Sequence, residues 1–232
     1  MNSNRKTAVI VGVLFITATV TAIVGGFFIL GSLNAPDSLV SVSANENQML
    51  IGVLFELILA GAVVGIGVLM FPILKKHNEA LALGYVGARI FEAVVFVVGV
   101  ISLLSLLTLS QEYVAGAPDA SYFQTLGTLL LAVRDWTLLL GGMIFLGLGA
   151  LMFYYLLYQS KLIPRFLSVW GLIGATLVLV AGLLGMFGYN PGVILSLPIA
   201  SQEMVLAVWL IVKGFNSSAI ASGSAKTDTS KV

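Results

Sequence analysis

Six long apolar segments, separated by short polar ones, account for most of the chain. Each can cross a bilayer, because a membrane-spanning helix needs about 20 predominantly apolar residues. We place the spans at residues 8–32, 49–73, 81–108, 122–157, 166–188 and 194–214. The connections are short, so consecutive helices are expected to pack as antiparallel neighbours. The pattern predicts an all-α polytopic membrane protein, with a bundle of six transmembrane helices formed by residues 1–215.

The polar segments alternate in charge. Lys and Arg precede the first span, follow the second, fourth and sixth, and are missing from the loops at 34–47, 110–121 and 189–191. Because basic loops stay on the cytoplasmic side, this alternation predicts that both termini are cytoplasmic. The first apolar run is too long for a signal peptide, so we expect an uncleaved first span. Residues 216–232 are rich in Ser, Ala, Thr and Lys and are expected to form a disordered cytoplasmic tail.

The fourth apolar segment is longer than a bilayer requires. A helix from Tyr122 to Tyr158 would be about 55 Å long, against a hydrocarbon core of about 30 Å. The helix must therefore either project outward or bend, and Gly141-Gly142 is the candidate point for a bend. If only residues 137–157 span the core, Arg134 and Asp135 lie at the outer interface.

Composition excludes several classes of function. Charged residues make up 9% of the chain, against about 25% in soluble domains, and the net charge of +1 gives no reason to expect nucleic-acid binding. The absence of cysteine excludes disulfides, thiolate chemistry and cysteine-based metal sites. The single histidine, His77, lies in a Lys-containing loop and is expected to be a solvated residue. With no catalytic motif in the sequence, we expect no enzymatic activity, no catalytic residue, no metal ligand and no cofactor.

Charged residues inside the apolar segments are the main indication of function. Each such residue costs about 2.5–3.5 kcal/mol at a helix centre, so it should face the bundle interior and find a partner. Arg89 and Glu92 are three positions apart and can pair on one helix face. Arg134 is expected to bridge Glu56 and Glu203, which leaves acidic groups in excess. The candidate ligand- or ion-binding residues are Glu56, Arg89, Glu92, Arg134, Asp135 and Glu203.

Two interpretations of these charges remain open. They could form an ion or proton pathway, or a polar cavity for a small polar or cationic ligand; alternatively, they could be a salt-bridge network that only fixes helix packing. Arg89 and Glu92 fit the second interpretation better. Glu203 follows Pro198 and several polar residues, and a proline-interrupted helix can free carbonyl groups around a binding site. Pro198 could equally well mark the start of the helix.

Glycine and aromatic positions add structural expectations. Gly61-x-x-x-Gly65 and the series Gly182, Gly185 and Gly188 allow close helix approach, either within the bundle or in a homo-oligomer. Tyr and Trp prefer the membrane–water interface. On that basis the cytoplasmic interface is expected at Tyr85, Tyr154, Tyr155, Tyr158 and Trp170.

Several stretches resemble a bacterial and archaeal family catalogued as domain of unknown function 4386. The similar residues are Leu157–Arg165, Trp170-Gly171, Pro198, Glu203-Met204 and Trp209–Phe215, together with Tyr85–Glu92. The resemblance covers nearly the whole chain up to the tail, although family members often carry Arg where this chain has Gln159. It implies a multi-span protein of a prokaryotic plasma membrane and brings no known activity.

These observations lead to a functional hypothesis and an alternative. The protein is expected to be a small transporter, channel-like or ligand-sensing protein that binds a small polar or cationic ligand, or a proton, within the lipid bilayer. The alternative is a non-catalytic accessory or structural membrane subunit. An enzyme acting on lipid is the weakest hypothesis, because no nucleophile or metal cluster is evident.

Overall fold

The computed structural model describes residues 3–35, 37–116, 120–190 and 192–220 of the chain. Within these ranges the structure is helical, and six helical segments are long and apolar enough to cross a membrane. The predicted all-α bundle of six apolar helices is therefore confirmed. The segments are α1 (Ser3–Leu33), α3 (Glu46–Leu74), α4 (Glu79–Val114), α5 to α6 (Ala120–Leu139 and Leu146–Ser160), α7 (Arg165–Met186) and α8 (Leu197–Val212).

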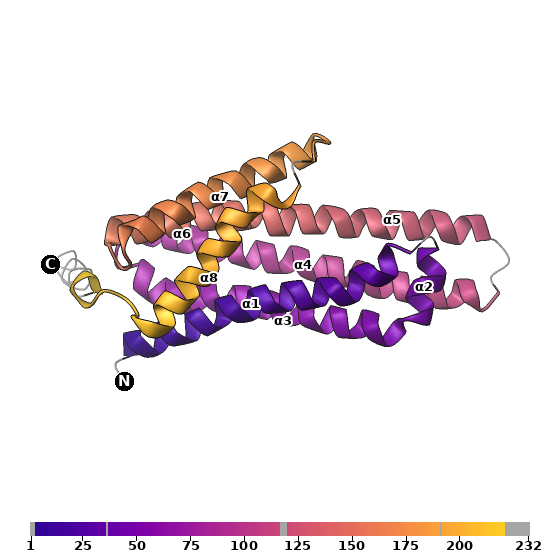
Figure 1. Cartoon of the computed structure of the whole chain (residues 1–232), viewed down its shortest axis with the longest axis horizontal. Helices are drawn as coiled ribbons and strands as arrows, with labels where there is room; N and C mark the ends of the chain where they lie inside the picture. Colours follow the sequence, from indigo (N-terminus) through magenta and orange to yellow (C-terminus); the bar gives the residue numbers. More distant parts are fainter. Residues whose placement is uncertain (1–2, 36, 117–119, 191, 221–232) are drawn as a thin grey trace.

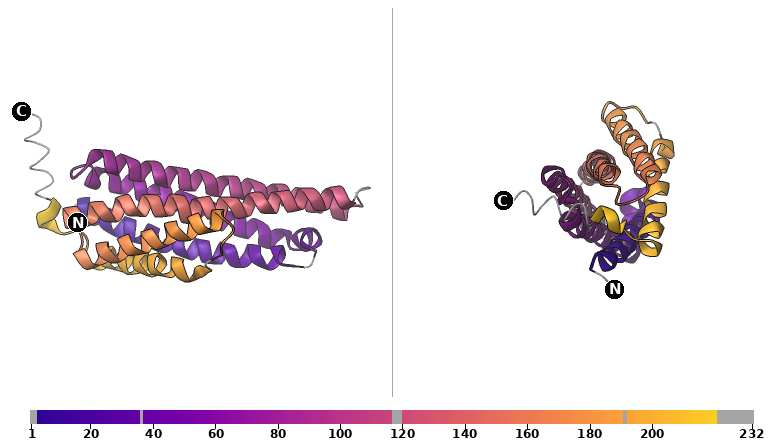
Figure 2. Two further views of the ribbon diagram at one scale, coloured as in Figure 1. Left: turned by 90° about the horizontal axis from the view of Figure 1, so that it is seen from above. Right: turned by 90° about the vertical axis from the view of Figure 1, so that its left-hand side faces the viewer.

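The helices run along one long axis and pack mainly on neighbours in sequence (Figures 1 and 2). α1 packs on α3, α3 on α4, α4 on both α5 and α6, α6 on α7, and α7 on α8. α8 also packs on α1, so the first and last spans lie together. Arg5 fixes this contact by donating hydrogen bonds to the carbonyl oxygens of Leu210 and Val212, at 2.9 and 3.1 Å.

The long fourth segment extends beyond the length of a bilayer core and contains an irregular helical turn. A π-helical turn, η1 (Leu140–Phe145), separates α5 from α6 at the predicted Gly141-Gly142 position. A Cβ atom at Gly141 would lie 2.9 Å from the Phe96 ring of α4, so a larger residue would crowd this contact. π turns insert an extra residue into a helix and re-aim the side chains that follow, and many occur at functional sites.

A short helix that the pattern does not predict follows α1. α2 (Ser38–Ala44) is capped by Asp37, whose carboxylate accepts a hydrogen bond from the Val40 amide at 3.2 Å. It packs on α4 near the far end of the bundle. We call this end, formed by α2, the last turns of α4 and the first turns of α5, the head.

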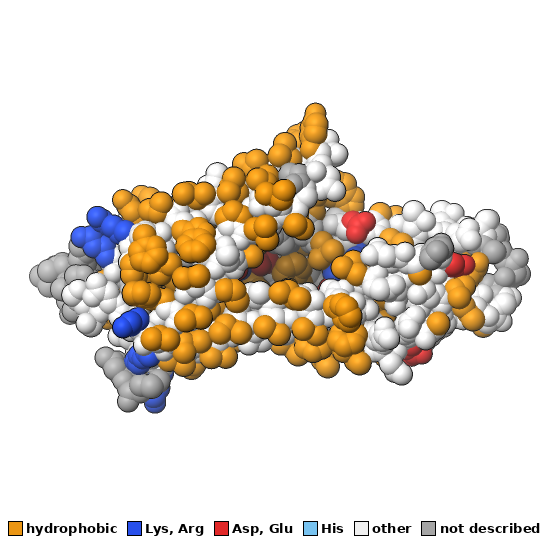
Figure 3. All heavy atoms as spheres, in the orientation of Figure 1, with side chains coloured by type: hydrophobic (Ala, Val, Ile, Leu, Met, Phe, Trp, Pro, Cys, Tyr) orange, Lys and Arg blue, Asp and Glu red, His pale blue; other side chains and the backbone are white. Residues whose placement is uncertain are grey.

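The head extends beyond the length that a bilayer core requires. α4 is about 54 Å long, which is about 24 Å more than a core of about 30 Å requires. Figure 3 shows hydrophobic side chains over most of the rest of the bundle, whereas the head shows fewer of them and mostly backbone and side chains that are neither hydrophobic nor charged. The spans expose large apolar side chains such as Phe27, Leu54 and Ile101, as expected for a surface in contact with lipid.

Basic side chains gather at the opposite end of the bundle (Figure 3). We call it the basic end, and it carries Arg5, Lys6, Lys75, Lys76, Lys161, Arg165 and Lys213. α1 begins there and α8 ends there (Figure 1). Its identity with the cytoplasmic side, and hence the N-in/C-in orientation, stays a prediction from the charge pattern.

The apolar interior is divided into two main cores. The inner core, next to the basic end, includes Phe15, Met70, Phe153 and Leu210, and the outer core, next to the head, includes Ile29, Met49, Leu103 and Leu106. The charged residues of the spans lie between these cores. We call this middle part of the bundle, which holds the candidate residues at more than one depth, the charged layer.

Some local expectations require correction. Tyr85 and Tyr154 are fully buried in the inner core rather than placed at the membrane interface, whereas Tyr155 is 44% exposed. The residues from 217 to 220 at the start of the predicted tail are helical, and 221–232 lie outside the described residues. Disorder of the tail therefore stays a prediction.

The glycine series mostly serve internal packing. Cβ atoms at Gly182 and Gly185 would come within 2.9 Å of α5–η1–α6 side chains, and one at Gly65 would lie 3.1 Å from Leu14 of α1. A Cβ at Gly61 would meet nothing within 4 Å. These contacts support the packing interpretation for three positions, and a homo-oligomer through glycine-rich faces stays a prediction.

Candidate functional site

Arg89 is the centre of the first charged cluster. Its Nη1 lies 2.9 Å from Glu92 Oε2 on the same helix, as the i, i+3 spacing predicts, and its Nη2 lies 3.5 Å from Glu203 Oε1 on α8. Its Nε donates a hydrogen bond to the Tyr85 hydroxyl, one turn earlier on α4, at 3.3 Å. Arg89 thus joins two carboxylates and a phenol from two helices.

Small neighbours make room for this cluster. A Cβ at Gly67 of α3 would lie 3.2 Å from the Arg89 Cβ, so glycine lets α3 approach the base of the arginine side chain. The guanidinium also lies over the Tyr85 ring, 5.5 Å from its centroid, in a favourable cation–π position. The arginine is therefore enclosed on several sides and only 2% exposed.

The cluster contains more negative than positive charge. With all groups ionised, the Arg89 guanidinium faces two carboxylates, which leaves one negative charge without a matching side chain. A buried charge without a partner is strongly unfavourable. One proton or one small cation would neutralise the excess negative charge of the cluster. This need for one more positive charge is the main chemical property of the cluster.

Arg134 and Glu56 form a second ion pair, between α5 and α3. Gly99 of α4 makes room for it, because a Cβ there would lie 2.8 Å from Arg134 Nη1 and 2.6 Å from Thr137 Oγ1. Both side chains are over nine-tenths buried, and each keeps an atom without a hydrogen-bond partner among the residues that the structure describes, Glu56 Oε2 and Arg134 Nη1. Such atoms ordinarily bind water or a ligand.

The two clusters lie at different depths. Arg89 is about 15 Å along α4 from Glu79 at the basic end, near the middle of a core of about 30 Å. Glu56 is about 27 Å along α3 from Leu74, close to the outer boundary. Asp135 is exposed and joins neither cluster. The structure therefore brings together five of the six predicted residues in two groups, and leaves Asp135 outside them.

One prediction about these residues was wrong in part, because Arg134 pairs with Glu56 as expected but not with Glu203. Arg134 does not bridge Glu56 and Glu203, because Glu203 pairs with Arg89 instead. The sequence could not show this, since the partner of Glu203 depends on how α8 crosses α4 and α1. Of the two interpretations of Pro198, the structure supports the one in which it marks the start of a helix, because it lies in the first turn of α8.

A hollow on the side of the bundle reaches the charged layer. Figure 3 shows it near the middle of the displayed face, bounded by α8, α1 and α5, with acidic and basic side-chain atoms visible inside. The Glu203 side chain keeps 15% of its surface exposed, against 4% for Glu92 and 3% for Arg89. The hollow lies within the hydrophobic part of the surface and so faces the lipid.

Two polar residues near the first cluster were missed as site residues. Tyr154 of α6 donates a hydrogen bond to Gln202 Oε1, and Gln202 Nε2 donates to the Leu167 carbonyl of α7 at 3.0 Å. Both side chains are fully buried, so they link α6, α7 and α8 immediately beside Glu203. The position of Gln202, next to Glu203 in an apolar helix, was the available signal.

The described residues contain no group of three or more His, Asp or Glu side chains arranged to hold a metal ion. The arrangement instead offers ion pairing and proton exchange, from carboxylates and guanidinium groups in a low-dielectric interior. Charged hydrogen bonds of this kind are strong there, because little water competes for them.

Comparison with known proteins places the chain in a family without supplying an activity. Searches of curated proteins and of solved structures each returned no match. The family model described as domain of unknown function (DUF4386) matches residues 10–214, a range that includes all six charged residues of the spans. The chain therefore belongs to the DUF4386 family of proteins of unknown function.

Proposed function

We propose that this integral membrane protein is a small transporter or ligand-sensing protein whose binding site is the Arg89–Glu92–Glu203 cluster. The ligand is a small cation or a proton, which supplies the positive charge that the cluster lacks. No catalytic step is part of this proposal. The bilayer in which it works is proposed to be a prokaryotic plasma membrane.

The observation that carries the proposal is the partial exposure of the Glu203 side chain, at 15% against 4% for Glu92 and 3% for Arg89. A purely structural ion pair would be best protected if both partners were enclosed, because water weakens charge interactions. Glu203 instead supplies the second carboxylate of an acid-rich cluster and keeps part of its side chain exposed. This position lets a cation reach the carboxylate without first separating Arg89 from Glu92.

The hollow also indicates the route and the chemistry of the ligand. It opens among hydrophobic side chains on the side of the bundle, so a ligand would enter from the bilayer (Figure 3). A cation that partitions into lipid, with an apolar body and a positive group, fits this route. Once inside, its positive group would pair with Glu203 and its apolar part would contact neighbouring helices.

Ligand-dependent thermal unfolding tests the proposal. A ligand that binds the folded state raises the melting temperature in proportion to the logarithm of its concentration. We expect the lipophilic cation tetraphenylphosphonium, or one of a series of alkylammonium ions, to stabilise the wild-type protein in detergent. The Glu203→Gln variant should lose this stabilisation.

Glu112→Gln is the matched control, because Glu112 is exposed on α4 and far from the cluster. It should keep the wild-type response. Proton exchange is followed separately through the infrared C=O band of protonated carboxylic acids, which should change with pH in the wild type and not in Glu203→Gln. If neither cations nor pH distinguishes wild type from Glu203→Gln, the proposal is wrong.

The alternative is an accessory membrane subunit whose charges only fix helix packing. The near-complete burial of Arg89, Glu92, Glu56 and Arg134 favours it, because paired charges at such positions specify which helix faces meet. This alternative predicts that the protein copurifies with another membrane protein. It also predicts that replacing both charged partners of an ion pair by neutral residues leaves this association with the other membrane protein unchanged.

A further inference from the structure

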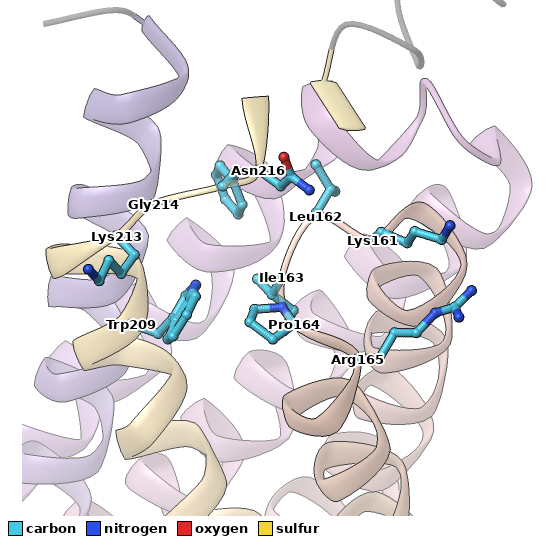
Figure 4. Close-up of a pocket in the computed structure, with 10 residues that line it drawn as sticks. Lys161, Leu162, Ile163, Pro164, Arg165, Trp209, Lys213, Gly214 and Asn216 are labelled. Atoms are coloured by element: carbon cyan, nitrogen blue, oxygen red, sulfur yellow. The ribbon is translucent and has the colours of Figure 1, made fainter. Parts of the chain in front are cut away.

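A pocket of about 540 Å³ lies at the basic end, where the loop between α6 and α7 meets the end of α8. Its walls include Pro164 and Trp209, and its rim carries three basic residues, Lys161, Arg165 and Lys213. Figure 4 shows Lys213 on one side of Trp209 and Lys161 and Arg165 on the other side, beyond Pro164. The three side chains point outward, and all three residues are exposed. The Arg165 guanidinium lies over the Tyr158 ring, 5.2 Å from its centroid, so the two lysines are the side chains that can turn over a bound group without losing such a contact.

An apolar groove of about 440 Å³ continues from this pocket. The two share Trp209 and Lys213. The remaining lining of the groove is apolar and runs along α8 through Met204, Val205, Val208 and Val212. Because α8 ends at the basic end, the groove extends about 12 Å from the level of Lys213 toward the middle of the bundle.

Charge at this place favours an anion. The described residues that line the pocket and the groove include three basic side chains and no acidic one. The pocket contains both the start of α7 at Arg165 and the end of α8 at Lys213, so the opposite partial charges of the two helix ends offset each other and the preference for an anion rests on the three basic side chains. Trp209 lies between the polar pocket and the apolar groove, a position in which its amphipathic ring is favourable.

We propose that the pocket and the groove together form a binding site for an anionic phospholipid. The phosphate of the headgroup lies in the pocket among Lys161, Arg165 and Lys213, and one acyl chain lies along Val205 and Val208 of α8. Basic pockets between membrane helices on the cytoplasmic side bind anionic headgroups in this way. The proposal does not depend on the charged layer inside the bundle.

Quenching of Trp209 fluorescence by brominated lipids tests the proposal. A protein with Trp136→Phe and Trp170→Phe retains Trp209 as its single tryptophan, since the chain has three. In bilayers of equal brominated-lipid content, phosphatidylglycerol should quench Trp209 more than phosphatidylcholine does. One basic residue near an anionic surface contributes about 1 kcal/mol, so we expect at least about fivefold preference in relative binding constant.

Two sets of substitutions identify the residues responsible. Lys161→Gln, Arg165→Gln and Lys213→Gln together should reduce the preference to about one. Lys6→Gln, Lys75→Gln and Lys76→Gln remove the same charge at the same end of the bundle, away from the pocket, and should leave the preference intact. Equal quenching by both lipids in the parent protein, or equal loss in both triple variants, would overturn the proposal.

A final measurement separates a lipid from a free phosphate compound. In detergent, glycerol phosphate presents the same anionic group without acyl chains. It should not displace brominated phosphatidylglycerol at millimolar concentration, because the groove contributes to binding only when a chain is present. Displacement by glycerol phosphate would overturn the assignment of the groove and show a site for a soluble anion.

Discussion

Arg89 on α4 and Glu203 on α8 meet inside the bundle with Nη2 and Oε1 3.5 Å apart, although two other spans separate them in the chain. Arg89 has a second partner in Glu92, at 2.9 Å, whereas Arg89 is the only salt-bridge partner of Glu203 among the described residues. This unequal sharing makes the two ends of the ion pair respond differently to mutation. In the function proposed above, Glu203 is the ligand-binding carboxylate and Glu92 is the structural one.

Glu203→Gln is expected to change the free energy of unfolding by less than about 1 kcal/mol, because the remaining Arg89–Glu92 pair is balanced. Arg89→Gln leaves two buried carboxylates without a cation and should reduce stability by about 3–5 kcal/mol. Denaturant titration of the two variants and the wild type in one detergent measures both values. A loss above about 3 kcal/mol in Glu203→Gln would assign Glu203 a packing role and favour the accessory-subunit alternative.

Glu56 and Arg134 are expected to stabilise the protein as an ion pair in which each residue depends on the other. Each is the only salt-bridge partner of the other among the described residues, so Glu56→Gln or Arg134→Gln alone leaves an uncompensated buried charge. Each single change should destabilise the protein by about 3–5 kcal/mol. The double variant should lose less than the sum of the two, and the coupling energy from a double-mutant cycle measures the difference. Additive losses would mean that the two side chains do not interact.

Gly99 is expected to tolerate no side chain, because of its contact with Arg134. Gly99→Ala places a methyl group within 3 Å of Arg134 Nη1 and Thr137 Oγ1, so it should reduce stability by about 1–3 kcal/mol. Gly87→Ala on the same helix meets nothing within 4 Å and should raise stability by up to about 1 kcal/mol, since alanine favours helix. Thermal unfolding of both variants measures the difference in stability. If Gly99→Ala and Gly87→Ala change the stability equally, Arg134 does not lie against Gly99.

The spans could be predicted from the sequence because their signal is local and additive. About 20 consecutive apolar residues define a span whatever it packs against. The length of the fourth segment likewise required a projection or an irregular turn, and η1 lies at the predicted glycine pair. α2 was missed because a seven-residue helix depends on its Asp37 cap and its packing on α4, and the hydrophobic pattern contains neither.

The residues of the site could be predicted, but only part of their pairing could. Charges inside apolar helices are visible in any sequence, and the Arg89–Glu92 pair follows from spacing along one helix. The partner of Glu203 depends on helix crossing, where Gly12 lets α1 approach the Ala207 carbonyl of α8. Burial of Tyr85 and Tyr154 also depends on this packing, because interfacial and buried tyrosines look alike in sequence.

The orientation of the bundle can be tested through single cysteines, since the natural chain has none. Thr125→Cys lies on an exposed position of α5 in the head, and Lys75→Cys lies at the basic end. The positive-inside rule predicts that a membrane-impermeant maleimide labels Thr125→Cys in intact spheroplasts and labels Lys75→Cys only after lysis. If Lys75→Cys were labelled in intact spheroplasts and Thr125→Cys only after lysis, the head would face the cytoplasm and the predicted orientation would be wrong. Protection of Thr125→Cys both before and after lysis would show that the head is enclosed by lipid, and the Glu56–Arg134 pair would then lie deep in the membrane instead of near its outer boundary.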